Sequence, residues 1–230
     1  MKEKLVIVGI GSTGKRVYDF VKDYDLSDVI GFAVNDEYRT TDVFCDLPVY
    51  SVEKLDEIID KKAVKVFVAI LWDRLNSHRR RVYESLKARG FIFANIISPH
   101  SVIRGKINGT NCWVKDYVIV QTNVEVEEDT FLMASCFVGA DTKIGPHCFI
   151  ATRSTVAGCC VIGEQSFVGL NCTVFDYTTV GKKCILGACT VVKRNVPDFS
   201  VVKTNISDMI IKQLSEDEIE TKLLSRKNVR

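Results

Sequence analysis

The residues best suited to bind a phosphate lie near the N-terminus, in the stretch Gly9-Ile10-Gly11-Ser12-Thr13-Gly14. An apolar run (residues 4–9) precedes this stretch, and a segment with helical periodicity (residues 15–21) follows it. A glycine-rich turn between a strand and a helix directs backbone N–H groups at a phosphate, and glycine permits its close approach. Gly9, Gly11, Ser12, Thr13 and Gly14 are therefore predicted to bind the nucleotide part of a substrate. A tight strand–helix turn that binds nothing is the alternative.

A second polar pair completes the predicted nucleotide site. The apolar segment 29–34 ends at Asn35-Asp36, and Asp36 follows Gly14 by 22 residues (36 minus 14). An acidic side chain at about this distance meets a ribose hydroxyl in dinucleotide-binding folds. Asn35 and Asp36 are therefore added to the predicted nucleotide-binding residues.

Histidines are the side chains that titrate near neutral pH, and the chain has three of them. His78 falls in a helical segment with an expected surface position, and His100 falls in an expected turn between domains. His147 lies in the repetitive second half, at a position where side chains can face outward. His147 is predicted to be the general base, and Asp141 is predicted to orient a base or hold an ammonium group. For each, a solvated corner side chain is the alternative.

The first 97 residues contain the elements that would position the glycine loop. Further apolar segments at 29–34 and 64–70 alternate with helical periodicity at 15–21 and about 74–89. This alternation indicates a small, mostly parallel α/β domain of the Rossmann-like kind. It is short for a complete dinucleotide fold, so we expect one nucleotide. Basic residues 79–81 fall in the second helical segment, where a solvated face is expected.

The second half of the chain repeats every six residues. Fifteen of the sixteen residues in one column are Val, Ile or Leu. The column consists of Val102, Asn108, Val114, Val120, Val126, Leu132, Val138, Ile144, Ile150, Val156, Ile162, Val168, Val174, Val180, Leu186 and Val192. Neither a helix nor an alternating strand has this period. It predicts a triangular parallel β-helix of about five coils over residues 98–204, with one aliphatic residue inward per face. A short C-terminal helix is expected within residues 205–230.

Two companion columns accompany the aliphatic one. Glycine often follows the aliphatic residue, where we expect it to relieve crowding at corners and to adopt positive φ. Two residues before each aliphatic lies a small residue, Cys, Ser or Thr, over ten consecutive repeats. Most of the nine cysteines belong to this column and lack the paired spacing of zinc ligands. We therefore expect them to pack in the interior as free thiols, with no metal.

Composition excludes several function classes. The chain is 47% hydrophobic and 26% charged, with a net charge of +2. This balance gives no sign of a nucleic-acid partner. No apolar run has membrane-spanning length, so no membrane association is expected. Free cysteines fit a reducing compartment, and a cytoplasmic location is the expectation.

A glycine loop in an α/β domain followed by hexapeptide repeats resembles the bacterial sugar O-/N-acyltransferases. The likeness also extends to residues 31–38, 44–49, 144–150, 167–171 and 186–188. It implies that the β-helix is left-handed. It further implies a homotrimer with acetyl-CoA bound between neighbouring β-helices, where Gly169 and Gly187 would contact it. It also implies that the glycine loop holds the nucleotide of a nucleotide-linked amino sugar.

One departure from the family pattern affects the chemistry. Members carry a catalytic histidine before an acidic residue in this repeat, whereas the chain has Ala140 before Asp141. A hydroxyl needs a base to attack a thioester, and a neutral amine needs one less. We therefore favour acetyl-CoA-dependent N-acetylation of a nucleotide-linked amino sugar. The alternatives are O-acetylation and a lapsed enzyme that only binds nucleotide-sugar or CoA. A nicotinamide oxidoreductase is disfavoured, because no substrate domain accompanies the short α/β domain.

Overall fold

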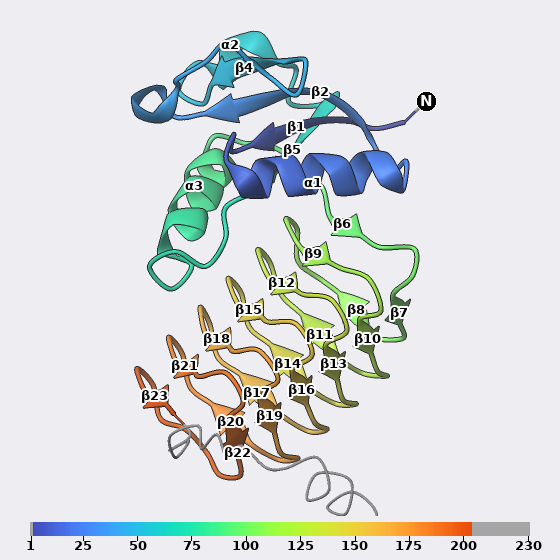
Figure 1. Ribbon diagram of the computed structural model, residues 1–230, viewed down its shortest axis with the longest axis vertical. Coiled ribbons are helices and arrows are strands. Elements are labelled where there is room, and N and C mark those ends of the chain that lie inside the picture. The colour runs from blue at the N-terminus through green and yellow to red at the C-terminus, as the bar shows by residue number, and fades with distance from the viewer. Residues whose placement is uncertain (1, 204–230) are drawn as a thin grey trace, which may run out of the picture.

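The computed structural model describes residues 2–203, so the C-terminal helix expected within 205–230 lies outside the described residues. A small α/β domain lies on one side of a long stack of short strands (Figure 1). No helix in the described part of the chain is long and apolar enough to cross a membrane.

The N-terminal domain is built on a five-stranded mixed sheet of order β3-β4-β2-β1-β5. Its strands are β1 (Lys4–Val8), β2 (Asp28–Val34), β3 (Val43–Phe44), β4 (Leu47–Ser51) and β5 (Val64–Val68). All neighbours pair in parallel except β3 with β4. The chain passes from β1 toward β2 and β4, and β5 then lies on the other side of β1. Such a reversal of strand order creates a crevice at the carboxyl ends of the strands.

Helices cover both faces of this sheet. They are α1 (Ser12–Asp23), α2 (Leu55–Ile58) and α3 (Ser77–Ala88), with a 3-10 turn η1 (Asp36–Tyr38) after β2. The face bearing Leu5 and Ile7 packs with α1 and turns toward the β-helix. The opposite face, bearing Val6 and Val8, packs with α2 and α3. Alternating residues of one central strand therefore serve two separate cores.

The second domain is a parallel β-helix with three faces. The first face holds β7 (Val102–Ile103), β10 (Ile119–Val120), β13 (Phe137–Val138), β16 (Thr155–Val156), β19 (Thr173–Val174) and β22 (Val191–Val192). The second holds β8 (Lys106–Ile107), β11 (Glu125–Val126), β14 (Lys143–Ile144), β17 (Val161–Ile162) and β20 (Thr179–Val180). The third holds β6 (Ile96–Ile97), β9 (Trp113–Val114), β12 (Phe131–Leu132), β15 (Phe149–Ile150), β18 (Phe167–Val168), β21 (Ile185–Leu186) and β23 (Val201–Val202).

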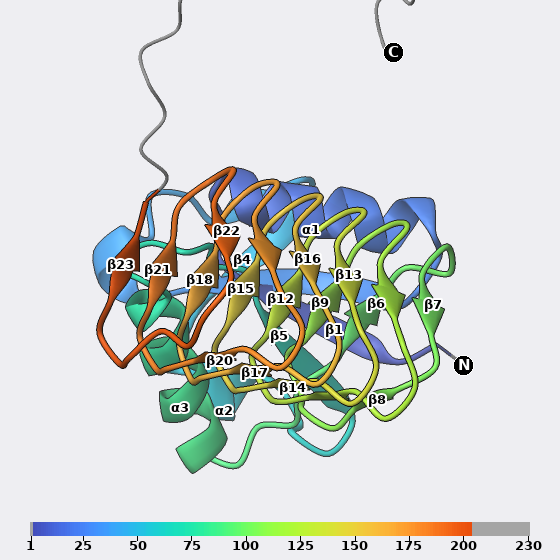
Figure 2. The same cartoon turned by 90° about the horizontal axis from the view of Figure 1, so that it is seen from below.

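The interior is the predicted aliphatic ladder from Val114 to Val192, and Figure 2 shows the coils side by side, from β23 at the left to β7 at the right. At the first coil the predicted register is wrong by one residue. Val120 pairs with Ile103, and Val126 pairs with Ile107, so these two isoleucines point inward instead of Val102 and Asn108. An apolar side chain is available next to each predicted position, and burial of that side chain fixes the register.

Each corner of the β-helix contains one residue with positive φ, and it is not the glycine. These residues recur every sixth position from Asn111 to Cys189, and their φ angles lie between 51° and 60°. The repeat glycines instead lie where a side chain would strike the next coil. A Cβ on Gly139 would lie 2.6 Å from the carbonyl carbon of Ala157, and one on Gly163 would lie 2.5 Å from that of Gly181. The expected crowding is confirmed, whereas the expected positive φ of these glycines is wrong.

The small column is buried as predicted, and its members also donate hydrogen bonds. Cys148 Sγ lies 3.2 Å from the carbonyl oxygen of Gly163, and Thr142 Oγ1 lies 2.9 Å from that of Ala157. Burial raises the pKa of the Cys148 thiol to about 12, so the thiol keeps its proton. Cysteine, serine and threonine alternate here because each is small and each supplies one donor.

The two domains meet across the third face, where aromatic side chains point outward every 18 residues. These are Trp113, Phe131, Phe149 and Phe167. Phe131 stacks on Phe67 of β5 at 5.8 Å between ring centroids, and Phe20 of α1 meets Trp113 edge-on at 6.0 Å. This ladder fixes the N-terminal domain on the β-helix.

Candidate functional site

Glycine is suited to each of the three glycine positions in the loop after β1 for a different structural reason. Gly9 has φ +127°, which disfavours any other residue. A Cβ on Gly14 would lie 2.0 Å from the carbonyl oxygen of Gly9, so Gly14 permits close packing of α1 on the strand. Gly11 has nothing within 4 Å of its Cβ position. Its missing side chain therefore leaves open space beside the loop.

The N-terminus of α1 faces this open space. Gly11 precedes the helix and makes no side-chain capping bond, and the first intrahelical bond runs from Lys15 N to Gly11 O at 3.1 Å. The N–H groups of the first helical residues thus have no intrahelical acceptor, and the helix dipole adds partial positive charge there. An anion of phosphate size would accept hydrogen bonds from these N–H groups and interact favourably with the partial positive charge.

A pocket of about 600 Å³ lies at this point, which is within the usual range for small-molecule sites. It is formed by the ends of β1, β2 and β5, the turn η1 and one side of α3. Of the predicted nucleotide-binding residues, five line it: Gly9, Gly11, Ser12, Thr13 and Asn35. Gly14 is buried beneath the loop, and Asp36 is exposed outside the lining.

Glu53 holds the segment after β2 in place. Its carboxylate accepts hydrogen bonds from Asn35 Nδ2 at 2.9 Å and from the backbone N–H of Asp36 at 3.0 Å. Burial opposes ionisation of Glu53, but these bonds and one from Ser51 outweigh it and lower the pKa of Glu53. Because Asn35 Nδ2 is engaged by Glu53, the amide oxygen remains as the free acceptor of this side chain.

The helix α3 contributes four pocket residues, of which the sequence interpretation placed His78 and Arg81 on a solvated surface. His78, Arg81, Val82 and Ser85 all line the pocket. Their spacing of three, four and seven residues is that of a single helix face. This face is readable in the sequence, but nothing local indicates what it meets.

Arg79 on the same helix is fully buried, so the expected solvated basic run is wrong at this position. Its Nε donates to Asp129 Oδ1 at 3.0 Å, and its Nη2 donates to the backbone oxygens of Asp129 and Cys148 at 2.8 and 3.1 Å. The guanidinium also lies 4.0 Å from the centroid of the Phe131 ring. Arg79 therefore anchors α3 to the second face–third face corner of the β-helix.

His147 belongs to this same buried group. It is 3% exposed, so the alternative of a solvated corner side chain is wrong, although the imidazole faces away from the coil, toward Tyr83 and Glu84 of α3. Its Nδ1 lies 2.9 Å from Asp129 Oδ2, and its Nε2 lies 3.8 Å from a carboxylate oxygen of Glu84 on α3. Its backbone oxygen accepts a bond from Asn76 Nδ2 at 2.9 Å. The imidazole is enclosed because α3 packs over the corner that it occupies.

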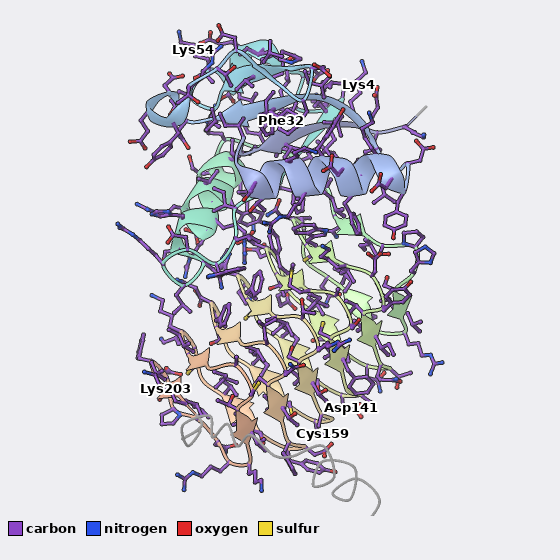
Figure 3. All side chains as sticks on the ribbon, viewed as in Figure 1. Lys4, Phe32, Lys54, Asp141, Cys159 and Lys203 are labelled. Carbon is purple, nitrogen blue, oxygen red and sulfur yellow. The ribbon has the colours of Figure 1, made fainter. Side chains whose placement is uncertain are left out.

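Asp141 occupies the preceding corner along the chain, between the first and second faces, and is exposed. Asn123 Nδ2 donates to its Oδ1 at 3.1 Å, and Ala140 precedes it. Figure 3 shows Asp141 and Cys159 on the edge of the β-helix that points away from the N-terminal domain. The structure therefore does not bring Asp141 together with His147 or with the pocket of the same chain.

Gly169 and Gly187 follow strands β18 and β21 in successive coils of the third face. A Cβ on Gly169 would lie 2.7 Å from the backbone nitrogen of Ala188. Coil stacking alone thus accounts for this glycine, and contact of either glycine with CoA stays a prediction. In the described part of the chain, no group of three or more His, Cys, Asp or Glu side chains is placed to hold a metal ion.

Comparison with solved structures finds clear likenesses over most of the chain. The acetyltransferase domain of PglB from Neisseria gonorrhoeae superposes with a TM-score of 0.77 at 24% identity, covering 88% of this chain and 97% of the other. A variant of perosamine N-acetyltransferase from Caulobacter crescentus, in complex with CoA and GDP-perosamine, gives 0.77 at 24% identity, with 86% and 92% covered. WeeI from Acinetobacter baumannii gives 0.51 at 18% identity, with 88% and 97% covered.

No protein-family model and no curated protein sequence matches the chain. At these identities the structural likenesses speak for the architecture, which joins the α/β domain to the stack of hexapeptide coils. The chain therefore has the fold of the hexapeptide-repeat sugar N-acetyltransferases.

Proposed function

We propose that the protein is an acyl-CoA-dependent acyltransferase that acetylates the amino group of a nucleotide-linked sugar. The observation that carries the proposal is the pocket beside Gly11, which joins an open helix N-terminus to a crevice of nucleotide size. The solved structures with this fold include one determined with CoA and GDP-perosamine. The pocket would hold the nucleotide of the acceptor, and the β-helix would hold the acyl donor.

The reaction transfers an acetyl group from sulfur to nitrogen. The neutral sugar amine attacks the thioester carbonyl, the N–C bond forms, the C–S bond breaks, and the amine proton is finally carried by the CoA thiol. The enclosed position of His147 favours the variant in which solvent or a substrate group removes this proton. Asp141 is exposed, and we propose that its carboxylate holds the sugar ammonium group until a proton leaves and the neutral amine can attack.

The assembly that we propose is a homotrimer with the site between copies. Asp141 lies on the edge of the β-helix away from its own N-terminal pocket (Figure 3), so a single chain would separate sugar and Asp141. A neighbouring copy could bring this corner to the pocket, with acetyl-CoA along the coils near Gly169 and Gly187. Light scattering at assay concentration should give the mass of three chains, and a monomer would contradict the proposal.

The decisive experiment measures thiol release from acetyl-CoA with a panel of UDP-, dTDP-, GDP- and CMP-linked amino sugars. Acetylation of the amine in one of them is the expected result. Binding of nucleotide-sugar without turnover would favour the lapsed binding protein, which Ala140 makes the second candidate. Acetylation of a hydroxyl with an untouched amine would replace the N-acyltransferase by an O-acyltransferase.

Two variants locate the parts of the site. Gly11→Val fills open space without touching the fold, so nucleotide-sugar affinity should fall while acetyl-CoA binding persists. His147→Ala would lower kcat by at least ~100-fold if the imidazole were the general base. We expect a far smaller change in kcat per folded molecule, together with lower stability, because Nε2 faces Glu84 instead of the pocket.

A further inference from the structure

The three consecutive arginines at the start of α3 (residues 79–81) point in three different directions. Arg79 is buried against the β-helix, and Arg80 pairs with Glu84 and Glu164. Arg81 lines the pocket and forms no hydrogen bond or ion pair with any of residues 2–203. Successive helical residues point about 100° apart, so three neighbouring arginines face three surroundings. Arg81 is thus the one arginine of the run without a protein partner.

The glycine loop provides no cation of its own. Lys15, the first lysine after the loop, is paired with Asp19 at 2.7 Å one turn along α1, and it does not line the pocket. The charged side chains of the described lining are Glu37 and Arg81, and His78 is held by Asp73 at 2.8 Å. Arg81 is therefore the permanent positive charge that faces the open N-terminus of α1.

We infer that Arg81 binds the diphosphate of the nucleotide, opposite the N–H groups of the glycine loop. A diphosphate carries more charge than the partial charge of one helix end compensates. A guanidinium supplies a fixed charge and a planar pair of donors that match two phosphate oxygens. The inference rests on the proposed function, because it takes the pocket to be a nucleotide site.

The position of Arg81 is fixed by the far side of its helix. Two residues earlier, Arg79 makes three hydrogen bonds of 2.8–3.1 Å to the β-helix, all of them buried. Two residues after Arg81, Tyr83 is fully buried, and its hydroxyl forms a hydrogen bond of 2.9 Å with Thr110 Oγ1. The β-helix thus holds α3 at a set distance from the glycine loop. The backbone that carries Arg81 is thereby placed before any ligand arrives, which reduces the entropic cost of binding.

The test compares equilibrium binding of UDP, GDP, uridine and guanosine to the full chain and to Arg81→Ala, by calorimetry. A hydrogen-bonded charge pair predicts a ~10- to 100-fold weaker affinity for the diphosphate that the wild type prefers. The matching nucleoside should bind within about twofold of wild type. Arg81→Lys should recover part of the loss, because lysine keeps the charge but lacks the planar fork.

Arg16→Ala is the matched control. Arg16 is an exposed arginine of the same domain outside the pocket lining, so it removes the same formal charge elsewhere. Its diphosphate affinity should stay within about twofold of wild type at 0.15 M salt, where remote charges are screened. An unchanged melting temperature of Arg81→Ala, expected since the side chain has no partner, confirms that folding is intact.

The outcomes separate this inference from the proposed function. Diphosphate binding that Arg81→Ala leaves intact would overturn the inference and keep the nucleotide site. An equal loss of nucleoside and diphosphate would also overturn it, because Arg81 would then only shape the pocket. If the wild-type chain binds neither UDP nor GDP, the inference is overturned, and turnover with the dTDP- and CMP-linked sugars still decides the proposed function.

Discussion

Replacing Arg79 by methionine tests whether the buried charge group holds the two domains together. Arg79 and Asp129 are both fully buried, so water solvates neither charge. Methionine retains much of the side-chain volume but leaves Asp129 with Asn111 and His147 as its polar partners. Removing one member of a buried ion pair typically costs about 3–5 kcal/mol, because the other charge remains desolvated. We expect Arg79→Met to lower the free energy of unfolding by about this amount.

Asp129→Asn completes a double-mutant cycle. Asparagine tolerates the positive φ of 54° at this corner, so the substitution changes charge with little backbone strain. If the two charges compensate one another, the double variant is no less stable than Arg79→Met alone. Additive losses would refute the coupling, and a loss below about 1 kcal/mol for Arg79→Met would refute the whole argument.

Arg80→Met serves as the neighbouring control. Its ion pairs with Glu84 and Glu164 are partly exposed, and such pairs contribute roughly 0–1 kcal/mol. Urea unfolding should be followed by tryptophan fluorescence, because both tryptophans lie at the domain junction. Trp113 is buried against Phe20, and Trp72, although 49% exposed, meets Phe149 edge-on at 5.1 Å. Far-UV circular dichroism of the same samples shows whether the junction opens before the domains unfold.

Two further predictions concern the coils and the acid stability of the N-terminal domain. Gly139→Ala should lower the free energy of unfolding by about 1–3 kcal/mol, because the new Cβ would lie 2.6 Å from the backbone of Ala157. Wild-type stability in thermal melts would contradict the coil-stacking account. Hydrogen bonds from Lys61 and Arg89 lower the pKa of Asp56 below its ordinary value of 3.8. The Asp56 carboxylate therefore stabilises the fold at neutral pH, and this contribution is lost as the pH falls through the folded-state pKa. Asp56→Asn should therefore flatten the dependence of stability on pH below about pH 4, measured by urea unfolding, and an unaltered acid limb would refute the assignment.

Much of the architecture was predictable because it depends on local chain geometry. One aliphatic residue must enter each face of each coil, so the ladder from Val114 to Val192 appears directly in the sequence. The glycine loop is likewise local, and five of the seven predicted nucleotide-binding residues line one pocket. The error at Val102 and Asn108 arose at the first coil, where the repeat is irregular and an inward isoleucine stands beside each position.

The pocket wall on α3 was not predictable in the same way. The spacing of His78, Arg81, Val82 and Ser85 describes one helix face, but the sequence does not state what faces it. Whether a helix face meets a ligand, a second domain or water depends on packing between segments far apart in the chain. A run of three arginines therefore looked uniformly solvated, although Arg79 is fully buried.

His147 and Asp141 separate most sharply what sequence and tertiary structure each decide. They occupy equivalent positions in consecutive repeats, and both have φ 59°. The sequence determines this local geometry, because the six-residue period places every such residue at a corner of the β-helix. It does not determine which corner is covered. Docking of α3 buries His147 against Asp129 and leaves Asp141 in solvent, since α3 packs over the corner that carries His147 and not over the one that carries Asp141.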